Sequence, residues 1–543
     1  MRERLIEDWL TKASERALEV PFCHMLGAEG YTVLHLARHG ELEQGKDILA
    51  RDQSGHPVAY QLKCMPGGRL RQGEWARDIK HQVERLVELP IEYPGVEPYP
   101  RHQSYLVVNG LIDDVVRVEI EALNRSRWVP FGFPALEVVQ RPALVGRMAA
   151  LGDGFWPLTL QATRRMLELY LSDGSGFLDQ SRLSGLLESA LHCADPPGAD
   201  GAARAIAGAG LATGCALAPF AEAANHAALI AGWTVYLAAA AGLAARLHLR
   251  DRAWASSLAI AEQAVDDALG QLVEEATAEG PTGELGPFTV DHMLSARATM
   301  VLGLSAVAAL WPGEDERRQR IRSGAIDLLR QQHTHIRFWG EGATPYWLAV
   351  TWGLERCGQG PASSDVLSIL IGCRCSRHGG RPRACPSPYL APADAVDYLL
   401  LEDAAAAGMR YPEAESSADL LQEDSYVLES LVHLLARRGS RGDVAAIWPA
   451  VSRMRFAQSV PDDLWERFRW RFDHGMLETR VPNRTQSWRE LREEAERADY
   501  SWVPTPLRER PHLVLLFLMA YPHRLCPDLV KLLDDGFRAA DGG

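Results

Sequence analysis

The sequence lacks several features that would point directly to a function. It has no low-complexity tract and no secretory signal at its start, and its nine cysteines among 543 residues are irregularly spaced. The glycine-rich stretches GDGFW and GAGLATG have no lysine, so a Walker-type phosphate loop is missing. We therefore expect a cytoplasmic protein with reduced cysteines and without a built-in ATP motor.

Long uncharged segments are also scarce. The main one is residues 227–244, AALIAGWTVYLAAAAGLA, which is followed by Arg246, His248 and Arg250. Alanine and glycine dominate it, and these residues gain little from transfer into lipid. Small residues at this density are typical of helices packed closely inside a large helical domain. We therefore expect no membrane association, although a membrane-linked effector that uses residues 205–244 is an alternative.

An excess of basic charge is missing overall, but the charge is unevenly spread. Residues 1–150 carry 19 Lys and Arg against 21 Asp and Glu, a net charge of −2, whereas the remainder carries 38 against 50, or −12. Residues 63–81 reverse the sign locally, and a basic patch of this kind can contact a nucleic-acid backbone. A solvated helix face is the alternative reading. The predicted DNA-binding residues are Arg69, Arg71, Arg77 and Lys80.

The hydrophobic pattern divides the chain into two regions. Residues 1–150 predict an α-β-β-β-α-β core with a mixed sheet: a helix from about Glu3 to Glu29, strands over 31–38, 46–51, 57–64, 104–112 and 135–140, and helices over 73–90 and 113–124. From residue 151 to 543 the strand signal disappears, which predicts an all-helical region, with a break near 358–390 if it forms two subdomains. The fold class is therefore an α/β domain followed by a large all-α domain.

The segment EQGKDILARDQSGHPVAYQLKC, residues 43–64, predicts a hairpin that carries polar residues in an apolar setting. If the turn centres near Ser54, Asp47 lies opposite residues 61–63, and alternation places Gln61 and Lys63 on one face. A carboxylate and an amide oxygen are ligands that Mg²⁺ accepts, and a lysine beside them can stabilise negative charge on a phosphate. An ordinary Asp–Lys ion pair across two strands is the simpler reading of the same residues.

Gly45–Ile48 (GKDI) followed by Ala59–Lys63 (AYQLK) resembles the PD-(D/E)XK nuclease superfamily, and most closely its Mrr-type restriction endonuclease branch. The helix that ends in MLGAEGYTV, Met25–Val33, is similar to that branch's entry into the first strand. The resemblance covers about residues 14–125. Lys46 stands where the superfamily has proline, and Gln61 replaces an acid.

The resemblance implies a metal-dependent endodeoxyribonuclease that uses Mg²⁺ or Mn²⁺. Asp47, Gln61 and Glu19 would hold the metal, with Glu15 as the alternative to Glu19, and Lys63 would be the catalytic lysine. It further implies a regulated effector of bacterial anti-phage defence or restriction, in which residues 151–543 sense, self-associate or bind a partner defence protein. A catalytically silent nuclease fold that binds DNA or supports assembly is the alternative function.

A second metal site is a weaker prediction. Cys373, Cys375, His378 and Cys385 have the residue types of a zinc site, but their spacing is not that of a standard zinc knuckle. A basic helix–helix loop is the preferred reading of this segment.

Overall fold

The computed structural model describes residues 2–36, 45–92, 97–151, 159–191, 198–281, 291–378, 381–382, 384–406, 420–460, 464–468 and 476–539. The chain forms two compact units: unit 1 is Met1–Asn225 with Arg246–Ala264, and unit 2 is His226–Ala245 with Val265–Gly543. An N-terminal mixed sheet with helices is followed by a largely helical region, and 66% of the chain is helical overall. The predicted fold class is confirmed.

The five-stranded sheet of unit 1 has the order β1-β2-β3-β5-β7. Its strands are β1 (Thr32–Leu36), β2 (Ile48–Arg51), β3 (Pro57–Lys63), β5 (Gln103–Val108) and β7 (Glu137–Val139). The pairs β1–β2 and β2–β3 are antiparallel, whereas β3–β5 and β5–β7 are parallel. Residues 58–62 are buried throughout, as expected of a central strand covered on both faces. The predicted mixed sheet is therefore present.

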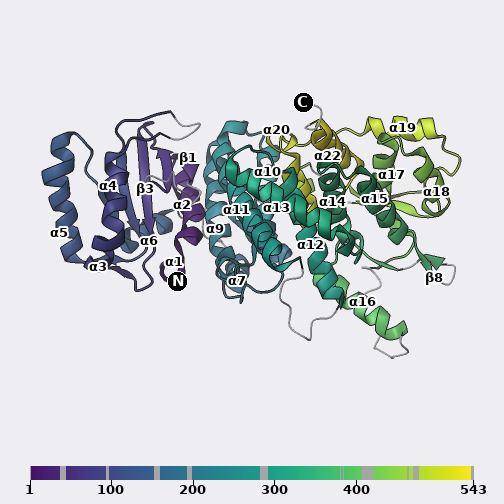
Figure 1. Ribbon diagram of the computed structural model, residues 1–543, viewed down its shortest axis with the longest axis horizontal. Helices are drawn as coiled ribbons and strands as arrows, with labels where there is room; N and C mark the ends of the chain where they lie inside the picture. Colours follow the sequence, from purple (N-terminus) through teal and green to yellow (C-terminus); the bar gives the residue numbers. More distant parts are fainter. Residues whose placement is uncertain are drawn as a thin grey trace. The chain divides into compact units, whose positions relative to one another are not determined.

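Helices cover both faces of this sheet (Figure 1). One layer contains the helical segments α3 (Gln72–Glu74), η1 (Trp75–Ile79), α4 (Lys80–Glu88) and α5 (Asp114–Leu123), and the opposite layer contains α2 (Glu15–Ala28). The core beneath the first layer includes Trp75, Val83, Leu106 and Trp128, all fully buried. On the other side, the ring of Phe22 on α2 meets Tyr60 of β3 edge to face, with 5.3 Å between ring centroids.

The first helix differs from its prediction. The structure has α1 (Arg2–Lys12) and α2 in place of one helix from Glu3 to Glu29. The predicted helix is interrupted at Ser14, whose backbone is extended. The Ser14 hydroxyl accepts a hydrogen bond from the amide of Ala17 and so caps the N-terminus of α2. The prediction missed this cap. The break lets α2 start as a separate helix at Glu15.

The remaining described helices of unit 1 follow the sheet. They are α6 (Arg141–Ala150), α7 (Leu160–Tyr170), α8 (Gln180–Ala190) and α9 (Ala199–Glu222). Because α7 to α9 belong to unit 1, the compact unit extends beyond residue 150. The functional boundary placed at 150 stays a prediction.

Unit 2 is mostly helical but not entirely so. Its longer described helices are α10 (His226–Arg246), α12 (Asp291–Leu310), α13 (Glu316–Gln332), α14 (Thr344–Arg356), α15 (Gly360–Arg374), α16 (Pro392–Ala406), α17 (Leu428–Arg437), α18 (Arg441–Val451), α19 (Trp488–Arg497), α21 (Pro511–Ala520) and α22 (Pro527–Ala539), while α11 (Ala255–Glu279) begins in unit 1. Short strands interrupt them, including β12 (Asp424–Ser425), β13 (Arg455–Val460) and β14 (Met476–Arg480) in one sheet. The predicted large helical region is confirmed, and these strands were not expected because two to six residues carry too little periodicity to detect.

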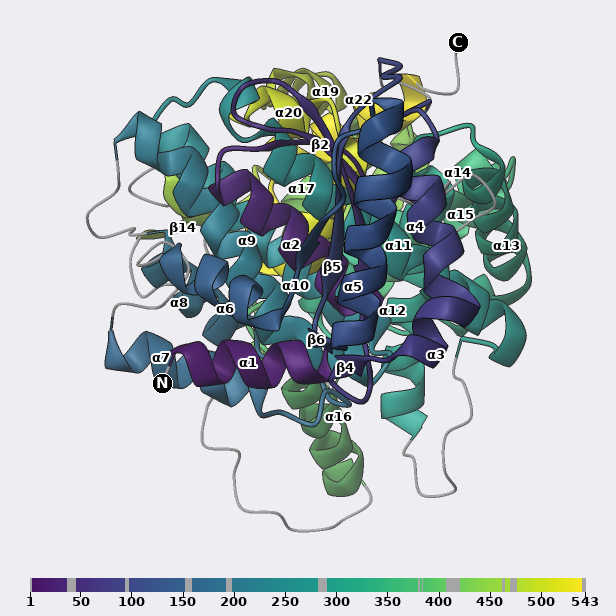
Figure 2. The same ribbon diagram turned by 90° about the vertical axis from the view of Figure 1, so that its left-hand side faces the viewer.

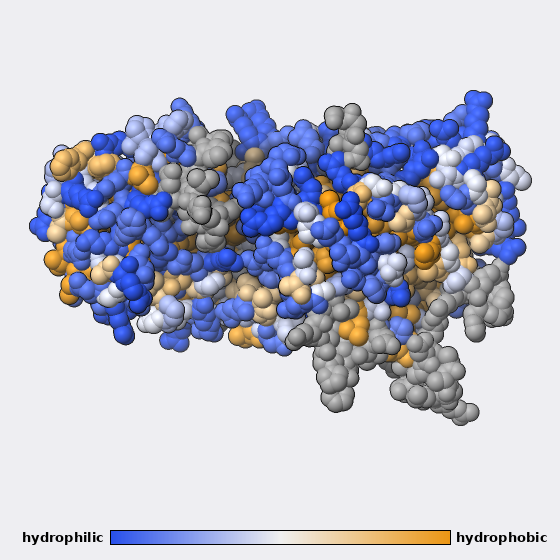
Figure 3. Space-filling model, viewed as in Figure 1, coloured by the Kyte–Doolittle hydropathy of each residue, from blue (hydrophilic) through white to orange (hydrophobic). Residues whose placement is uncertain are grey.

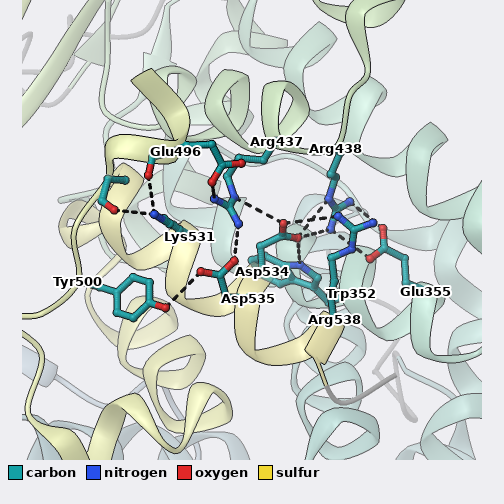
Figure 4. Close-up of polar contacts among 11 residues, drawn as sticks. Trp352, Glu355, Arg437, Arg438, Glu496, Tyr500, Lys531, Asp534, Asp535 and Arg538 are labelled. Atoms are coloured by element: carbon teal, nitrogen blue, oxygen red, sulfur yellow. Dashed lines mark hydrogen bonds and ion pairs between the residues drawn. The ribbon is translucent and has the colours of Figure 1, made fainter. Parts of the chain in front are cut away.

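A buried ion network joins four helices of unit 2 (Figure 4). Asp534 on α22 is 1% exposed and pairs at 3.1 Å with Arg438, the residue directly after α17. It also accepts a hydrogen bond from the indole N–H of Trp352 on α14. Arg437 pairs with Asp535 of α22 and with Glu496 at the end of α19, and Arg438 pairs with Glu355 of α14. Removing one member of such a network leaves a buried charge without its partner.

Candidate active site

The hairpin of β2 and β3 has the register that the sequence predicted. Ile48 pairs with Tyr60, which brings Asp47 opposite Gln61, and the Asp47 amide donates to the Tyr60 carbonyl at 2.8 Å. The Gln61 side-chain amide donates to Asp47 Oδ2 at 2.7 Å, and the Leu62 amide donates to the same oxygen at 2.6 Å. Asp47 Oδ1 has no hydrogen-bond donor among the described residues. One carboxylate oxygen is therefore fixed and the other remains available.

Helix α2 brings two acids to this hairpin. Glu15 and Glu19 are four residues apart, so they lie on one face of the helix. Glu15 forms an ion pair with Lys63 at 3.1 Å, and the Lys63 side chain is only 12% exposed. Glu19 is 7% exposed and acts electrostatically on Asp47. The predicted residues therefore form one cluster, and Glu15 and Glu19 both belong to it.

The cluster is rich in negative charge. Burial raises the pKa of Asp47 to about 7, the Leu62 hydrogen bond and Lys63 oppose this rise, and Glu19 and Glu15 add to it. Burial, followed by Glu15 and Glu19, also raises the pKa of the neighbouring Cys64 thiol to about 12. Lys63 acts on both groups in the opposite direction and lowers their pKa values. The site therefore holds more negative than positive groups, an arrangement that a bound cation would relieve.

The residues just before Asp47 hold it against α4. Gly45 has a left-handed φ of 73°, and a Cβ there would lie 2.4 Å from the carbonyl oxygen of Gln82. Lys46 is fully buried, and its ammonium donates to the Arg85 carbonyl at 3.4 Å. Burial, with a further contribution from Arg85, lowers the pKa of Lys46 to about 8. The GKD segment thus anchors the start of β2 through backbone contacts that no other residue type at position 45 would allow.

Asn109 forms hydrogen bonds at the same end of the sheet, and it was not among the predicted site residues. Its side chain donates to the Leu10 carbonyl at 2.8 Å and accepts from the Met65 amide at 2.7 Å, while its own amide donates to the Lys63 carbonyl. Asn109 is 1% exposed. It thereby links the end of α1 to the segment that follows Lys63. An asparagine directly after the apolar strand over 104–108 was the available sequence signal.

Helix α9 contacts the helix that carries the two glutamates. Helices α2 and α9 pack closely along their lengths. A Cβ at Gly210 would lie 2.4 Å from the His24 ring, and one at Gly214 would lie 2.4 Å from Pro21. Glycine at these two positions therefore sets how near the two helices approach. Since α9 follows residue 150, the position of Glu15 and Glu19 depends on a segment outside the predicted nuclease domain.

The predicted DNA-binding residues are mostly paired with acids. Arg69 pairs with Asp113 at 3.1 Å, Arg77 with Asp78 at 2.7 Å and Lys80 with Glu119 at 2.7 Å. Exposed ion pairs of this kind contribute about 0–1 kcal/mol to folding stability, so DNA phosphates can compete with the acids for these arginine and lysine side chains. Arg71 is exposed and has no side-chain partner among the described residues. Phosphate contact by these four residues stays a prediction. Substitution of Arg71 tests it most directly, because this change breaks no ion pair among the described residues.

The zinc site at Cys373, Cys375, His378 and Cys385 stays a prediction. Cys373 is exposed, Cys375 is half-buried and Cys385 is buried in β10 (Cys385–Pro386), while the side chain of His378 lies outside the described residues. Burial raises the pKa of Cys375 to about 11, which favours the neutral thiol over the thiolate that zinc binds.

Among the described residues, one other group of side chains has metal-ligand chemistry. Glu429, His433 and Glu494 offer ligand atoms within 4.8 Å of one another. Arg480 pairs with both carboxylates. The guanidinium therefore already neutralises much of the charge that would attract a metal ion.

Three helical segments in the described part of the chain are long and apolar enough to cross a membrane: Gly201–Glu222, His226–Arg246 and His292–Leu310. Their apolar windows are 89%, 78% and 67% buried within the protein. This burial agrees with the expectation that residues 227–244 form a packed helix. It accounts for their composition without a bilayer.

Comparisons of this chain with models of known protein families, with curated proteins and with solved structures found no match.

Proposed function

We propose that the chain is a metal-dependent endodeoxyribonuclease whose active site is the cluster of Asp47, Gln61, Lys63, Glu15 and Glu19. The observation that carries the proposal is the convergence of these side chains from β2, β3 and α2 on one end of a mixed sheet. The order of Asp47, Gln61 and Lys63 along the chain is the one in which the sequence resembles the PD-(D/E)XK nucleases. A regulated role in anti-phage defence or restriction is part of this proposal and rests on the resemblance.

The residues present fit a hard divalent cation. Asp47 Oδ1 and the side-chain oxygen of Gln61 are candidate ligands, since the Gln61 contact with Asp47 uses its amide nitrogen. Glu19 adds a buried carboxylate that acts on Asp47. Mg²⁺ accepts one or two carboxylates and carbonyl-type oxygens, and it completes its shell with water or phosphate oxygens. When bound, such an ion supplies positive charge that favours attack of water on a phosphodiester.

The chain's own residues would orient and stabilise the reacting groups. The Leu62 amide and the Gln61 side chain fix the Asp47 carboxylate. Lys63, at the end of β3, would donate to a non-bridging phosphate oxygen and stabilise the charge that develops there. Glu15 holds the ammonium in place until a phosphate competes for it. Arg69, Arg71, Arg77 and Lys80 would contact the DNA backbone beside the site.

Cleavage of plasmid DNA by the purified full-length protein, with Mg²⁺, Mn²⁺ or EDTA, tests the proposal. We expect metal-dependent nicking or linearisation, and a loss on the order of 100-fold or more in Asp47→Ala and Lys63→Ala. Lys12→Ala, which changes an exposed lysine on α1, is the matched control. Activity at the wild-type level in either site variant would remove the assignment.

A silent nuclease fold is the second candidate. The Lys63–Glu15 ion pair favours it, because that pair satisfies the lysine without any metal or phosphate. DNA binding without cleavage under every metal condition, and undiminished in Asp47→Ala, would select this reading. In both readings residues 151–543 would regulate the N-terminal part or bind its partners.

A further inference from the structure

Helices α17 and α19 of unit 2 bring three side chains with metal-ligand chemistry together. Glu429 and His433 are four residues apart on α17, so they lie on one face of that helix. Helix α19 packs against α17 (Figure 1 and Figure 2) and adds Glu494. One ligand atom from each residue lies within 4.8 Å of the other two. Zn²⁺ binds nitrogen and oxygen at about 2.0–2.2 Å, so its ligands lie about 3–4 Å apart, and a rotation of the glutamate side chains closes the difference.

The imidazole of His433 is the buried group in this cluster that the fold does not satisfy. His433 is 6% exposed, and its Nδ1 is buried without a hydrogen-bond partner among the described residues. A buried polar atom of this kind costs free energy, and a bound ion or water molecule is a common explanation for it. Burial lowers the pKa of His433 to about 4, so the ring is neutral at pH 7, which is the form that binds metal ions. A neutral imidazole beside two carboxylates is a donor set for a divalent transition-metal ion.

Arg480, at the end of β14, meets the two carboxylates from the solvent side. The glutamate side chains are 17% and 24% exposed, whereas the Arg480 side chain is 50% exposed. The guanidinium offsets one of the two negative charges. Burial, with contributions from Glu494 and Asp528, holds the pKa of Glu429 above its ordinary value although Arg480 lowers it. The site therefore still attracts positive charge, and a divalent cation can displace the half-exposed guanidinium into solvent.

Glu494 is oriented to accept such an exchange. Burial opposes its ionisation, but hydrogen bonds from Arg480 and Gln486 lower the pKa of Glu494. The Gln486 side-chain amide donates to Oε2 at 2.6 Å, whereas Arg480 donates to Oε1. When Arg480 leaves, Gln486 still fixes the carboxylate, and Oε1 is free for the ion. Figure 3 shows hydrophilic residues at the upper right edge of the view, where α19 lies in Figure 1, so ions in solution meet a polar surface there.

We propose that Glu429, His433 and Glu494 form a binding site for a divalent transition-metal ion of the Zn²⁺ class, and that Arg480 competes with the ion for the two carboxylates. The ion binds the unsatisfied imidazole and links α17 to α19 within unit 2, and water completes its coordination. One nitrogen and two oxygen ligands distinguish this site from the oxygen ligands at Asp47, which suit Mg²⁺. This inference does not depend on the proposed nuclease activity.

Calorimetric titration of the purified full-length protein with Zn²⁺, after treatment with EDTA and dialysis, tests the site. Glu494→Gln and His433→Asn should each weaken Zn²⁺ binding at this site by about 10–100-fold or more. Glu493→Gln, which changes the exposed neighbouring glutamate on α19, is the matched control and should bind Zn²⁺ as wild type does. Other groups of the chain can also take up Zn²⁺, so the result is the one equivalent that Glu494→Gln loses relative to Glu493→Gln. Circular dichroism should be unchanged in both glutamine variants, because glutamine has nearly the shape of glutamate.

Arg480→Gln separates a metal site from an ion-pair cluster. If Arg480 competes with the ion, this change should strengthen Zn²⁺ binding by about tenfold, and Zn²⁺ should raise the melting temperature of Arg480→Gln more than that of wild type. In an ion-pair cluster the same change removes the cation that the carboxylates need and creates no Zn²⁺ site. Equal Zn²⁺ uptake by Glu494→Gln and Glu493→Gln would overturn the proposal. So would an Arg480→Gln variant that binds Zn²⁺ no more tightly than wild type does.

Discussion

Asp47→Asn should stabilise the protein at alkaline pH while removing the proposed catalytic carboxylate. Asp47 is 5% exposed, and its pKa is raised from the ordinary 3.8 to about 7, first by burial and further by Glu19 and Glu15. The folded chain therefore binds a proton more strongly than the unfolded chain does. The associated stability is fully present below pH 4 and is lost as the pH rises through 7.

The difference between the pKa values of 3.8 and about 7 means that the ionised Asp47 lowers the free energy of unfolding above pH 7 by at most about 4 kcal/mol. Asparagine keeps the acceptor for the Leu62 amide but carries no charge, whereas Lys63 loses a favourable neighbour. We therefore expect a gain of about 2 kcal/mol at pH 8, or roughly 4–8 °C in the melting temperature of unit 1. The gain should shrink toward zero near pH 4.

Calorimetry of wild type and Asp47→Asn between pH 4 and pH 8.5 measures this difference. Asp78→Asn, which changes an exposed aspartate of the same unit, is the control and should alter the melting temperature little. Mg²⁺ should raise the melting temperature of wild type at pH 8 and do so less in Asp47→Asn. An Asp47→Asn protein that is equally destabilised at every pH would refute the view that this carboxylate is an unfavourable buried charge.

Four further outcomes follow from contacts described above. Gln61→Glu places a second carboxylate against Asp47, so thermal stability at pH 8 should fall without metal and recover with Mg²⁺, as measured by melting in EDTA and in Mg²⁺. Gly210→Ala should cost about 1–3 kcal/mol in urea unfolding, because the added methyl group meets the ring of a buried histidine on α2. Asp534→Ala should destabilise unit 2 by about 3–5 kcal/mol, since it leaves buried arginines unpaired; an unchanged unfolding midpoint would contradict this. A fragment of residues 1–225 should resist proteolysis better than one of 1–150, because only the longer fragment covers the outer face of α2.

Much of the N-terminal architecture could be predicted because its strands are apolar and bounded by clear turns. The DQSGHP turn set the hairpin register, and the register alone brought Asp47 opposite Gln61. The sequence could not reveal that the amide nitrogen of Gln61 faces Asp47, because the rotamer depends on the Leu62 amide sharing the same oxygen. Nor could it decide between Glu15 and Glu19, since both lie on the same helical face.

What the sequence could not predict depends on contacts between distant segments. Periodicity favoured one long N-terminal helix, and the local cap at Ser14 overrode it. The contact of α9 with α2 was invisible, because a glycine in an alanine-rich helix gives no indication of its partner. The pairing of Arg69 with Asp113, directly before α5, and of Lys80 with Glu119 on α5 likewise depends on the fold. The basic patch is therefore less positive than a count of its residues suggests.

The close approach of α9 to α2 couples the position of α9 to cation binding by the cluster at Asp47. Glu15 and Glu19 lie on α2, which packs against both the sheet and α9. A ligand or partner that binds two positions of α9 with unequal affinity would therefore change the affinity of the acidic cluster for a cation. By reciprocity, a cation held at Asp47 changes the affinity of that partner by the same factor. Partner affinity measured with and without Mg²⁺ would therefore report on the site even in a variant that cannot cleave.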